Sequence, residues 1–221
     1  MVYQLTTLTQ QIYDHIKRKI VTLEFPPGSV INEADLGAEL KTGRTPIREA
    51  LQRLERDKLV VILPRRGTFV TDVNIADLPL LYDGRVVLEK YITRLAATRG
   101  TVKQWDEMEE VLTKIVAKAE EATLEELVEA DRKCHEIIFT AANHKFLNDT
   151  LVMLYAQSDR LWHVYSLDIK IMHRAISEHQ AILAALRKRD SDQAALLIEE
   201  HIQTFRSEIQ TIMMEELFQS S

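Results

Sequence analysis

The chain has 221 residues, of which 46 % are hydrophobic and 28 % charged, a balance typical of globular proteins. Six glycines and five prolines are few for this length, which argues against a turn-rich β-sandwich and for long helices. Apolar runs such as Ala181–Leu186 are far shorter than the about 20 residues that cross a membrane, and no signal peptide is apparent. The single cysteine, Cys134, excludes an internal disulfide framework, and we expect a cytoplasmic protein with no membrane partner.

Charge is distributed unevenly along the chain, whose formal net charge is −6. Residues 1–72 carry 11 basic and 9 acidic side chains, whereas residues 73–221 carry 17 and 25. Within residues 40–70, 8 basic side chains stand beside only 3 acidic ones. A basic patch on an otherwise acidic chain indicates a phosphate-binding surface, although a solvated charged face has the same composition.

Two helices are predicted at the start of the chain. Apolar residues at every fourth position predict the first over residues 7–21, and residues 25–28, with two prolines and a glycine, end it. Asn32 is the expected N-cap of a short second helix, which buries Leu36 and Leu40.

A third helix and a hairpin follow. Thr45 is the expected N-cap of the third helix, with Pro46 in the first helical position, and this helix runs to about residue 57. The β-prone run 59–63, a turn at 64–67 and a returning strand at 68–71 predict a two-stranded hairpin. Three helices and a hairpin within about 70 residues predict a winged helix-turn-helix.

Polar side chains follow one face of the third helix and the tip of the hairpin. Arg44, Arg48 and Gln52 are spaced by four residues, so they share a face opposite the apolar stripe. Guanidinium pairs with guanine or phosphate and the glutamine amide with adenine, while Arg65 and Arg66 at the hairpin tip suit a groove or the backbone. The alternative is an amphipathic helix with a wet arginine face.

Five runs occur in this order along residues 8–72: Phe25-Pro26-Pro27-Gly28, Glu33-Ala34-Asp35-Leu36, Arg44-Thr45-Pro46-Ile47-Arg48-Glu49-Ala50-Leu51-Gln52-Arg53-Leu54, Leu59-Val60 and Arg66-Gly67-Thr68-Phe69-Val70. In these runs the sequence resembles the DNA-binding domain of the GntR family of bacterial transcription regulators. The resemblance implies DNA contacts from Arg44, Thr45, Arg48, Arg66 and Gly67. The sequence departs from the family pattern at Thr42-Gly43, where Val-Ser is usual, and at Lys58, where glycine is usual.

The rest of the chain reads as an all-helical bundle without strands, because apolar spacings of three and four persist throughout. We therefore expect a mostly α protein: a DNA-binding domain over residues 1–72, a linker over 73–77 and a helical effector-binding and dimerisation domain over 78–221. Six helices are predicted in the bundle, over about residues 75–99, 102–119, 123–141, 144–165, 169–188 and 191–217.

Four residues of the bundle have spacings that suit a metal site. Asp131 and His135 are neighbours on one helix face, four residues apart. His179 and His201 each lie about eleven residues, or about 16 Å, from the turn predicted at 190–192, so an antiparallel hairpin would place them at matching heights. An aspartate with three imidazoles suits zinc first, and also nickel, manganese or iron. Each histidine alone is more often a surface or core residue.

The order of these residues also resembles the FadR-like C-terminal ligand-binding domain (FCD) of GntR regulators, over about residues 75–215. The resemblance implies that Asp131, His135, His179 and His201 are the metal ligands. It further suggests that Arg85, and similarly Arg160, lines the pocket and pairs with a ligand carboxylate, although Arg85 could equally be a surface partner of Glu89 four residues later.

The predicted function is that of a homodimeric transcription regulator. Most regulators of the family it resembles are repressors, so we expect repression, although the sequence itself does not give the sign. It would bind an operator in double-stranded DNA and respond to a small carboxylate effector bound at a divalent metal. The sequence shows no motif of catalysis. Two alternatives remain open: a metal-dependent enzyme with a nucleic-acid-binding head, and a regulator whose metal is purely structural.

Overall fold

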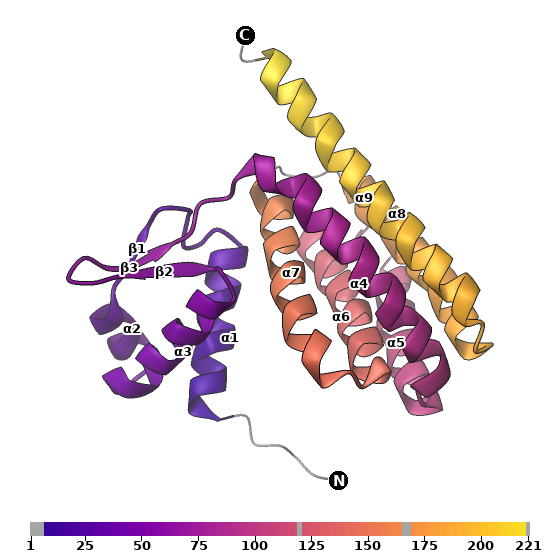
Figure 1. The fold of residues 1–221 in the computed structure, drawn as a ribbon, viewed down its shortest axis with the longest axis horizontal. Coiled ribbons are helices and arrows are strands. Elements are labelled where there is room, and N and C mark those ends of the chain that lie inside the picture. Colours follow the sequence, from indigo (N-terminus) through magenta and orange to yellow (C-terminus); the bar gives the residue numbers. More distant parts are fainter. Residues whose placement is uncertain (1–6, 119–120, 165–168, 220–221) are drawn as a thin grey trace. The chain divides into compact units, whose positions relative to one another are not determined.

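The computed structural model describes residues 7–118, 121–164 and 169–219 (Figure 1). This part of the chain contains nine α-helices, one 3-10 turn and a three-stranded antiparallel sheet, which confirms the mostly α class. Its contacts define two compact units. The first holds the described residues up to Ile75 together with Ala156–Val164, and the second holds the remainder. The segment 156–164, which we assigned to the bundle from the sequence, thus groups with the first unit.

The first unit begins with three helices, α1 (Leu8–Val21), α2 (Glu33–Glu39) and α3 (Arg44–Arg56). The Thr7 hydroxyl accepts from the backbone amide of Gln10 and starts α1. Asn32 caps α2 as predicted, because its side-chain oxygen accepts from two backbone amides of the first turn.

The predicted start of the third helix is wrong by two residues. Gly43, in an extended conformation and without a side chain to cap, is the N-cap, and α3 begins at Arg44. Thr45 is therefore the second helical residue and Pro46 the third. Proline is tolerated there because the amides of the first turn have no partner within the helix.

The sheet has three strands instead of the predicted two. β2 (Val60–Leu63) and β3 (Gly67–Val70) form the expected hairpin, and β1 (Val30–Ile31) pairs with the other edge of β3, in the order β1-β3-β2. Sequence reasoning missed β1 because two residues are too few to show an alternating pattern, and its partner lies almost forty positions away. The Cα registers are Val30↔Phe69 and Ile31↔Thr68.

The first unit has its own apolar core, made by α1, α2, α3 and the inner face of the sheet. Lys58, in the turn after α3, has a φ of 60°, the left-handed region in which glycine is favoured. The departure from the family pattern at this position therefore carries a conformational cost. Fully or nearly fully buried members of the core include Ile12, Ile16, Ile20, Ile47, Ala50, Leu51, Leu54 and Leu59.

The second unit is the predicted helical bundle. Helix α4 packs against α6 and α9, α8 packs against α6 and α9, and α5 packs against α6 and α8 (Figure 1). The first helix begins later than predicted, because residues 75–77 form a 3-10 turn before it. The bounds are α4 (Leu78–Arg99), α5 (Val102–Ala117), α6 (Leu124–Ala142), α7 (Lys145–Val164), α8 (Ile169–Arg187) and α9 (Ser191–Gln219).

Capping residues fix the starts of two of these helices. Thr101 with Gln104, and Thr123 with Glu126, form reciprocal capping boxes at α5 and α6. Asn143 ends α6 in the left-handed conformation. Among the described residues, no helix combines the length and the apolar character needed to cross a bilayer.

Candidate DNA-binding face and candidate metal centre

The polar residues singled out on α3 lie on its solvent face. Arg44, Arg48 and Gln52 are exposed, whereas Ile47 and Leu51 on the opposite face are buried. The Arg48 Nε donates to the Glu33 carboxylate of α2 at 2.9 Å. This face of α3 is therefore open to a partner, and α2 holds one of its guanidinium groups.

The wing tip presents three further residues to solvent. Arg65, Arg66 and Gly67 are exposed in the turn between β2 and β3, where the Arg66 amide donates to the Leu63 carbonyl. Gly67 has a φ of 104°, which a side chain would strain. Thr45 is also exposed, in the first turn of α3.

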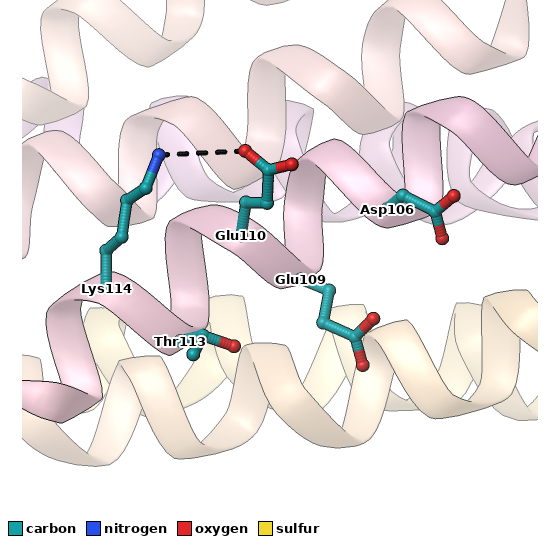
Figure 2. Close-up of a pocket in the computed structure, with 5 residues that line it drawn as sticks. All are labelled: Asp106, Glu109, Glu110, Thr113 and Lys114. Atoms are coloured by element: carbon teal, nitrogen blue, oxygen red, sulfur yellow. Dashed lines mark ion pairs between the residues drawn. The ribbon is translucent and has the colours of Figure 1, made fainter.

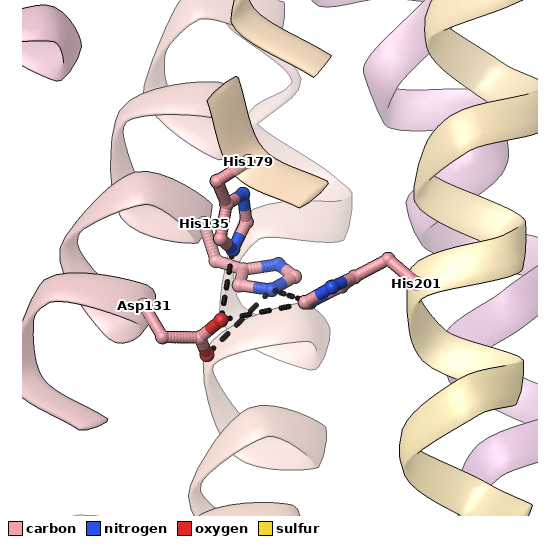
Figure 3. A group of neighbouring side chains, drawn as sticks. All are labelled: Asp131, His135, His179 and His201. Atoms are coloured by element: carbon pink, nitrogen blue, oxygen red, sulfur yellow. Dashed lines mark hydrogen bonds and ion pairs between the residues drawn. The ribbon is translucent and has the colours of Figure 1, made fainter. Parts of the chain in front are cut away.

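Four buried side chains from three helices converge in the second unit (Figure 3). Asp131 and His135 come from α6, His179 from α8 and His201 from α9, and one ligand atom of each lies within 4.8 Å of the others. The Asp131 Oδ1 lies 2.8 Å from the His179 Nε2 and 3.5 Å from the His201 Nε2. The Nε2 atoms of His135 and His201 lie 3.2 Å apart. We call this group the imidazole cluster.

The local sequence explains this convergence. The i, i+4 spacing places Asp131 and His135 on one face of α6. Helices α8 and α9 form an antiparallel pair joined at residues 188–190, so His179 and His201 meet with their ring centroids 4.6 Å apart. The structure thus brings together the four residues predicted from spacing.

Two carboxylates form a second layer that sequence reasoning did not identify. The Glu178 Oε2 lies 2.7 Å from the His201 Nδ1 and forms a hydrogen bond with it. The Glu89 Oε2 lies 2.8 Å from the His135 Nδ1, although this approach departs from hydrogen-bond angles. The Arg85 Nε donates to the other Glu89 oxygen at 2.5 Å. The sequence signals were only the adjacency of Glu178 to His179 and the i, i+4 spacing of Arg85 and Glu89.

The second layer determines which way the imidazole lone pairs point. A carboxylate beside Nδ1 favours the tautomer that carries its proton there, which leaves the Nε2 lone pair free. In His135 and His201 both lone pairs would then face each other across 3.2 Å, which is repulsive without a proton or cation between them. Ligand atoms at about 2.0 Å from a tetrahedral ion are about 3.3 Å apart, so this donor set fits a divalent metal.

Burial and neighbouring charges shift the pKa values of Asp131, His179 and Glu89. Burial would raise the pKa of Asp131, but the hydrogen bond from His179 and the neighbouring imidazoles outweigh it and hold this pKa well below its usual range. Burial, with the nearby His201, lowers the pKa of His179 to about 4. Burial also opposes ionisation of Glu89, yet Arg85 lowers its pKa to about 2. An ionised aspartate and a neutral imidazole are the forms that ligate metals.

The two arginines proposed to bind an effector lie in different places. Arg85 is buried beside the imidazole cluster, through Glu89, and its guanidinium lies 4.8 Å from the centre of the Tyr155 ring. Arg160 belongs to the first unit, where it donates to the carbonyl and hydroxyl oxygens of Thr71. Burial lowers the pKa of Arg160 to about 10, so it stays charged at neutral pH.

A surface hollow on α5 provides a contrast with the imidazole cluster. Figure 2 shows that charged side chains line it, with Lys114 paired to Glu110 at 3.6 Å. Asp106 and Glu109 both accept from Arg187 of α8. These groups are exposed and neutralise one another, as expected of a solvated helix face. The lining residues are Asp106, Glu109, Glu110, Thr113 and Lys114.

Comparison with protein families agrees with the two units. Residues 8–70 match the model of the bacterial regulatory proteins of the gntR family, and residues 80–204 match the FCD domain. The chain therefore belongs to the GntR family, with an FCD domain following its helix-turn-helix. It is a transcriptional regulator.

Individual relatives support this assignment. The chain is 27 % identical to the HTH-type transcriptional repressor RspR of Escherichia coli (strain K12), over 94 % of this chain and 91 % of that protein. It is 28 % identical to the Nta operon transcriptional regulator of Aminobacter aminovorans, over 87 % and 90 %. The E. coli McbR/YncC structure has the same fold, with a TM-score of 0.82 and 22 % identity over 96 % and 99 %. RspR and the Nta operon protein are both named as transcriptional regulators, in agreement with the prediction that this chain is a regulator and not an enzyme.

Proposed function

We propose that this protein is a homodimeric repressor that binds a palindromic DNA operator and responds to a small carboxylate bound at a divalent metal in its FCD domain. It would act in the cytoplasm. The observation that carries the proposal is the buried convergence of one carboxylate and three imidazoles, with two Nε2 atoms only 3.2 Å apart.

The exposed face of α3 supports the DNA-binding part of the proposal. Arg44, Arg48 and Gln52 would enter the major groove, because guanidinium and amide groups pair with base edges there. Thr45, at the start of α3, would lie beside a DNA phosphate. The wing residues Arg65, Arg66 and Gly67 would follow the adjacent backbone or minor groove.

The imidazole cluster would hold the metal through Asp131, His135, His179 and His201. A divalent cation bound there with a coordination number above four would supply positive charge and a position open to an effector carboxylate. Glu89 and Glu178 would keep the Nδ1 protons of His135 and His201 in place, so that Nε2 ligates. Zinc is our first candidate, with nickel, manganese and iron as alternatives.

Arg85 would complete the effector site. It is buried on α4, next to the carboxylate that orients His135. The guanidinium geometry matches a carboxylate, so an anionic ligand beside the imidazole cluster would gain a favourable interaction with the charge of Arg85.

An apolar stripe on α4 supports a homodimer. Leu80, Val87 and Tyr91 are 71 %, 67 % and 48 % exposed, and their spacing of seven and four residues places them on one side of the helix. Exposed apolar stripes of this kind often mark interfaces between protein chains. Two copies would match the two half-sites of a palindromic operator.

Elemental analysis of protein purified without a chelator or histidine tag tests the metal. We expect one divalent ion per chain in the wild type, and none in His179→Ala/His201→Ala. The matched control is His15→Ala/His173→Ala, which changes two histidines outside the imidazole cluster and should keep the ion. A metal-free wild type that still unfolds cooperatively would overturn the metal site and leave the DNA-binding proposal standing.

A carboxylate screen then separates a sensing metal from a structural one. Operator DNA selected from a random library with the wild-type protein serves as the probe. We expect at least one small carboxylate to change operator affinity in the metal-loaded protein and not in the double variant. If chelation lowers the melting temperature but no carboxylate changes DNA affinity, the metal is structural.

A further inference from the structure

Tyr155 on α7 is in direct contact with the imidazole cluster. Its hydroxyl donates to the Asp131 Oδ2, and its ring centroid lies 4.8 Å from that of His135. The side chain is buried, at 8 % exposure. A change in the charge on the Asp131 carboxylate therefore changes the strength of its hydrogen bond with Tyr155 of α7.

The same helix continues into the first unit. The division between the two units falls between Tyr155 and Ala156, and Ala156 is part of the apolar core of the winged helix. The next residue, Gln157, donates to the carbonyls of Asp57 and Lys58 at 3.0 and 3.2 Å.

Arg160 holds the neighbouring strand end. Its guanidinium donates to the Thr71 carbonyl at 2.5 Å and to the Thr71 hydroxyl at 3.0 Å, and its side chain is fully buried. The Thr71 hydroxyl in turn donates to the carbonyls of Lys58 and Leu59. Gln157 and Arg160 thus converge on the junction where α3 ends and the wing begins and returns.

Helix geometry explains how one element serves both places. At 100° per residue, Gln157 and Arg160 lie about 60° apart on one face of α7, and Tyr155 lies about 140–160° away from them. A continuous helix is stiff, so a shift imposed on Tyr155 moves the two anchors with it. Sequence reasoning saw Arg160 only as an effector ligand, because its partner Thr71 is 89 residues away.

We propose that α7 transmits the state of the imidazole cluster to the winged helix, with Tyr155 as the sensor and Gln157 and Arg160 as the anchors. This inference rests on the proposed metal site. When Asp131 ligates a cation, its Oδ2 is a weaker acceptor for the Tyr155 hydroxyl. The two states of the cluster then favour different positions of α7, which is the differential free energy that coupling requires.

Hydrogen–deuterium exchange of the full-length protein, metal-free and then loaded with Zn²⁺, tests the proposal. Couplings between sites typically correspond to about 5–150-fold, so we expect exchange of the amides at 57–60 and 70–72 to change about fivefold or more on loading. Arg160→Met should abolish this change and still take up Zn²⁺ with protection of α6, α8 and α9. The matched control, Arg187→Met on the exposed end of α8, should retain it.

Two milder variants keep the test decisive if Arg160→Met does not fold. Tyr155→Phe removes only the hydroxyl and Gln157→Ala only the amide, and each should reduce the change at 57–60. Zn²⁺ uptake without any change in the first unit, or a full change in the Tyr155→Phe and Gln157→Ala variants, would overturn the role of α7 alone. A wild type that takes up no Zn²⁺, measured by elemental analysis, would overturn the proposed metal site as well.

Discussion

In the first unit the side chains proposed to function stand on the surface, on one face of α3 and at the wing tip, above a core that is almost wholly apolar. In the second unit the corresponding groups are buried, and three helices supply them. An exposed polar group is hydrated whether or not it binds anything, whereas a buried one must find partners within the fold. We therefore expect substitutions of functional residues to leave the stability of the winged helix nearly unchanged and to lower the stability of the bundle.

The largest effect should come from the second layer of the imidazole cluster. Glu89→Gln leaves the Arg85 charge buried without its carboxylate, and breaking one partner of a buried pair costs about 3–5 kcal/mol of the free energy of unfolding. Urea denaturation of the metal-free protein measures this. The control Glu110→Gln, in an exposed pair with Lys114, should stay within about 0.5 kcal/mol. If Glu89→Gln lowered the free energy of unfolding by no more than Glu110→Gln does, the claim that stability depends on the buried site would be wrong.

Metal loading should give the next largest effect. Zn²⁺ at about 100 times its dissociation constant adds about 2.7 kcal/mol to stability, which raises the midpoint of thermal unfolding by about 5–10 °C. Scanning calorimetry with and without a chelator measures this. His179→Ala/His201→Ala should show no shift, and a shift of the same size in that variant would place the ion elsewhere.

A surface substitution should separate function from stability in the first unit. Arg48→Ala should weaken binding to the selected operator by about 1–3 kcal/mol and change the free energy of unfolding by less than about 0.5 kcal/mol. Fluorescence anisotropy and urea denaturation provide the two numbers. Arg94→Ala, an exposed arginine of the bundle paired with Asp192, should change neither. If Arg48→Ala unfolded the protein, function and stability would not be separable in the winged helix.

The smallest effect concerns the left-handed turn after α3. Lys58→Gly relieves the cost of a side chain at positive φ and should raise the free energy of unfolding by up to about 1 kcal/mol. Lys114→Gly, in the last turn of α5, should lower it by up to about 1 kcal/mol. Urea denaturation gives both values, and the same sign for both variants would contradict the conformational argument.

Local patterns were sufficient for most of the fold. Apolar periodicity located every helix of the bundle, and the Asn32 cap and the hairpin turn placed α2 and the wing. The failures were of two kinds. Strand β1 has only two residues and forms by pairing with β3. The start of α3 was misplaced because Thr45 and Pro46 are typical N-cap and first-turn residues, whereas the helix begins two residues earlier, with Gly43 as its N-cap.

In the candidate sites, helical spacing was enough to identify the residues that share a face: Arg44, Arg48 and Gln52 on α3, and Asp131 with His135 on α6. These are consequences of the 3.6-residue period, which needs no knowledge of neighbours. The hairpin of α8 and α9 extended the same reasoning to His179 and His201, because a short turn fixes the relative heights of two antiparallel helices.

The side chains that surround those faces come from other elements, and their positions depend on tertiary packing. Only packing brought Glu89 of α4 to His135, turned Tyr155 of α7 toward Asp131 and buried Arg160 against Thr71. Each of these contacts joins residues that are between 24 and 89 positions apart or lie on different helices, so no local period encodes it. Burial also strengthens the effect of neighbouring charges, which is why Arg85 and the imidazoles lower the pKa values of Glu89 and Asp131.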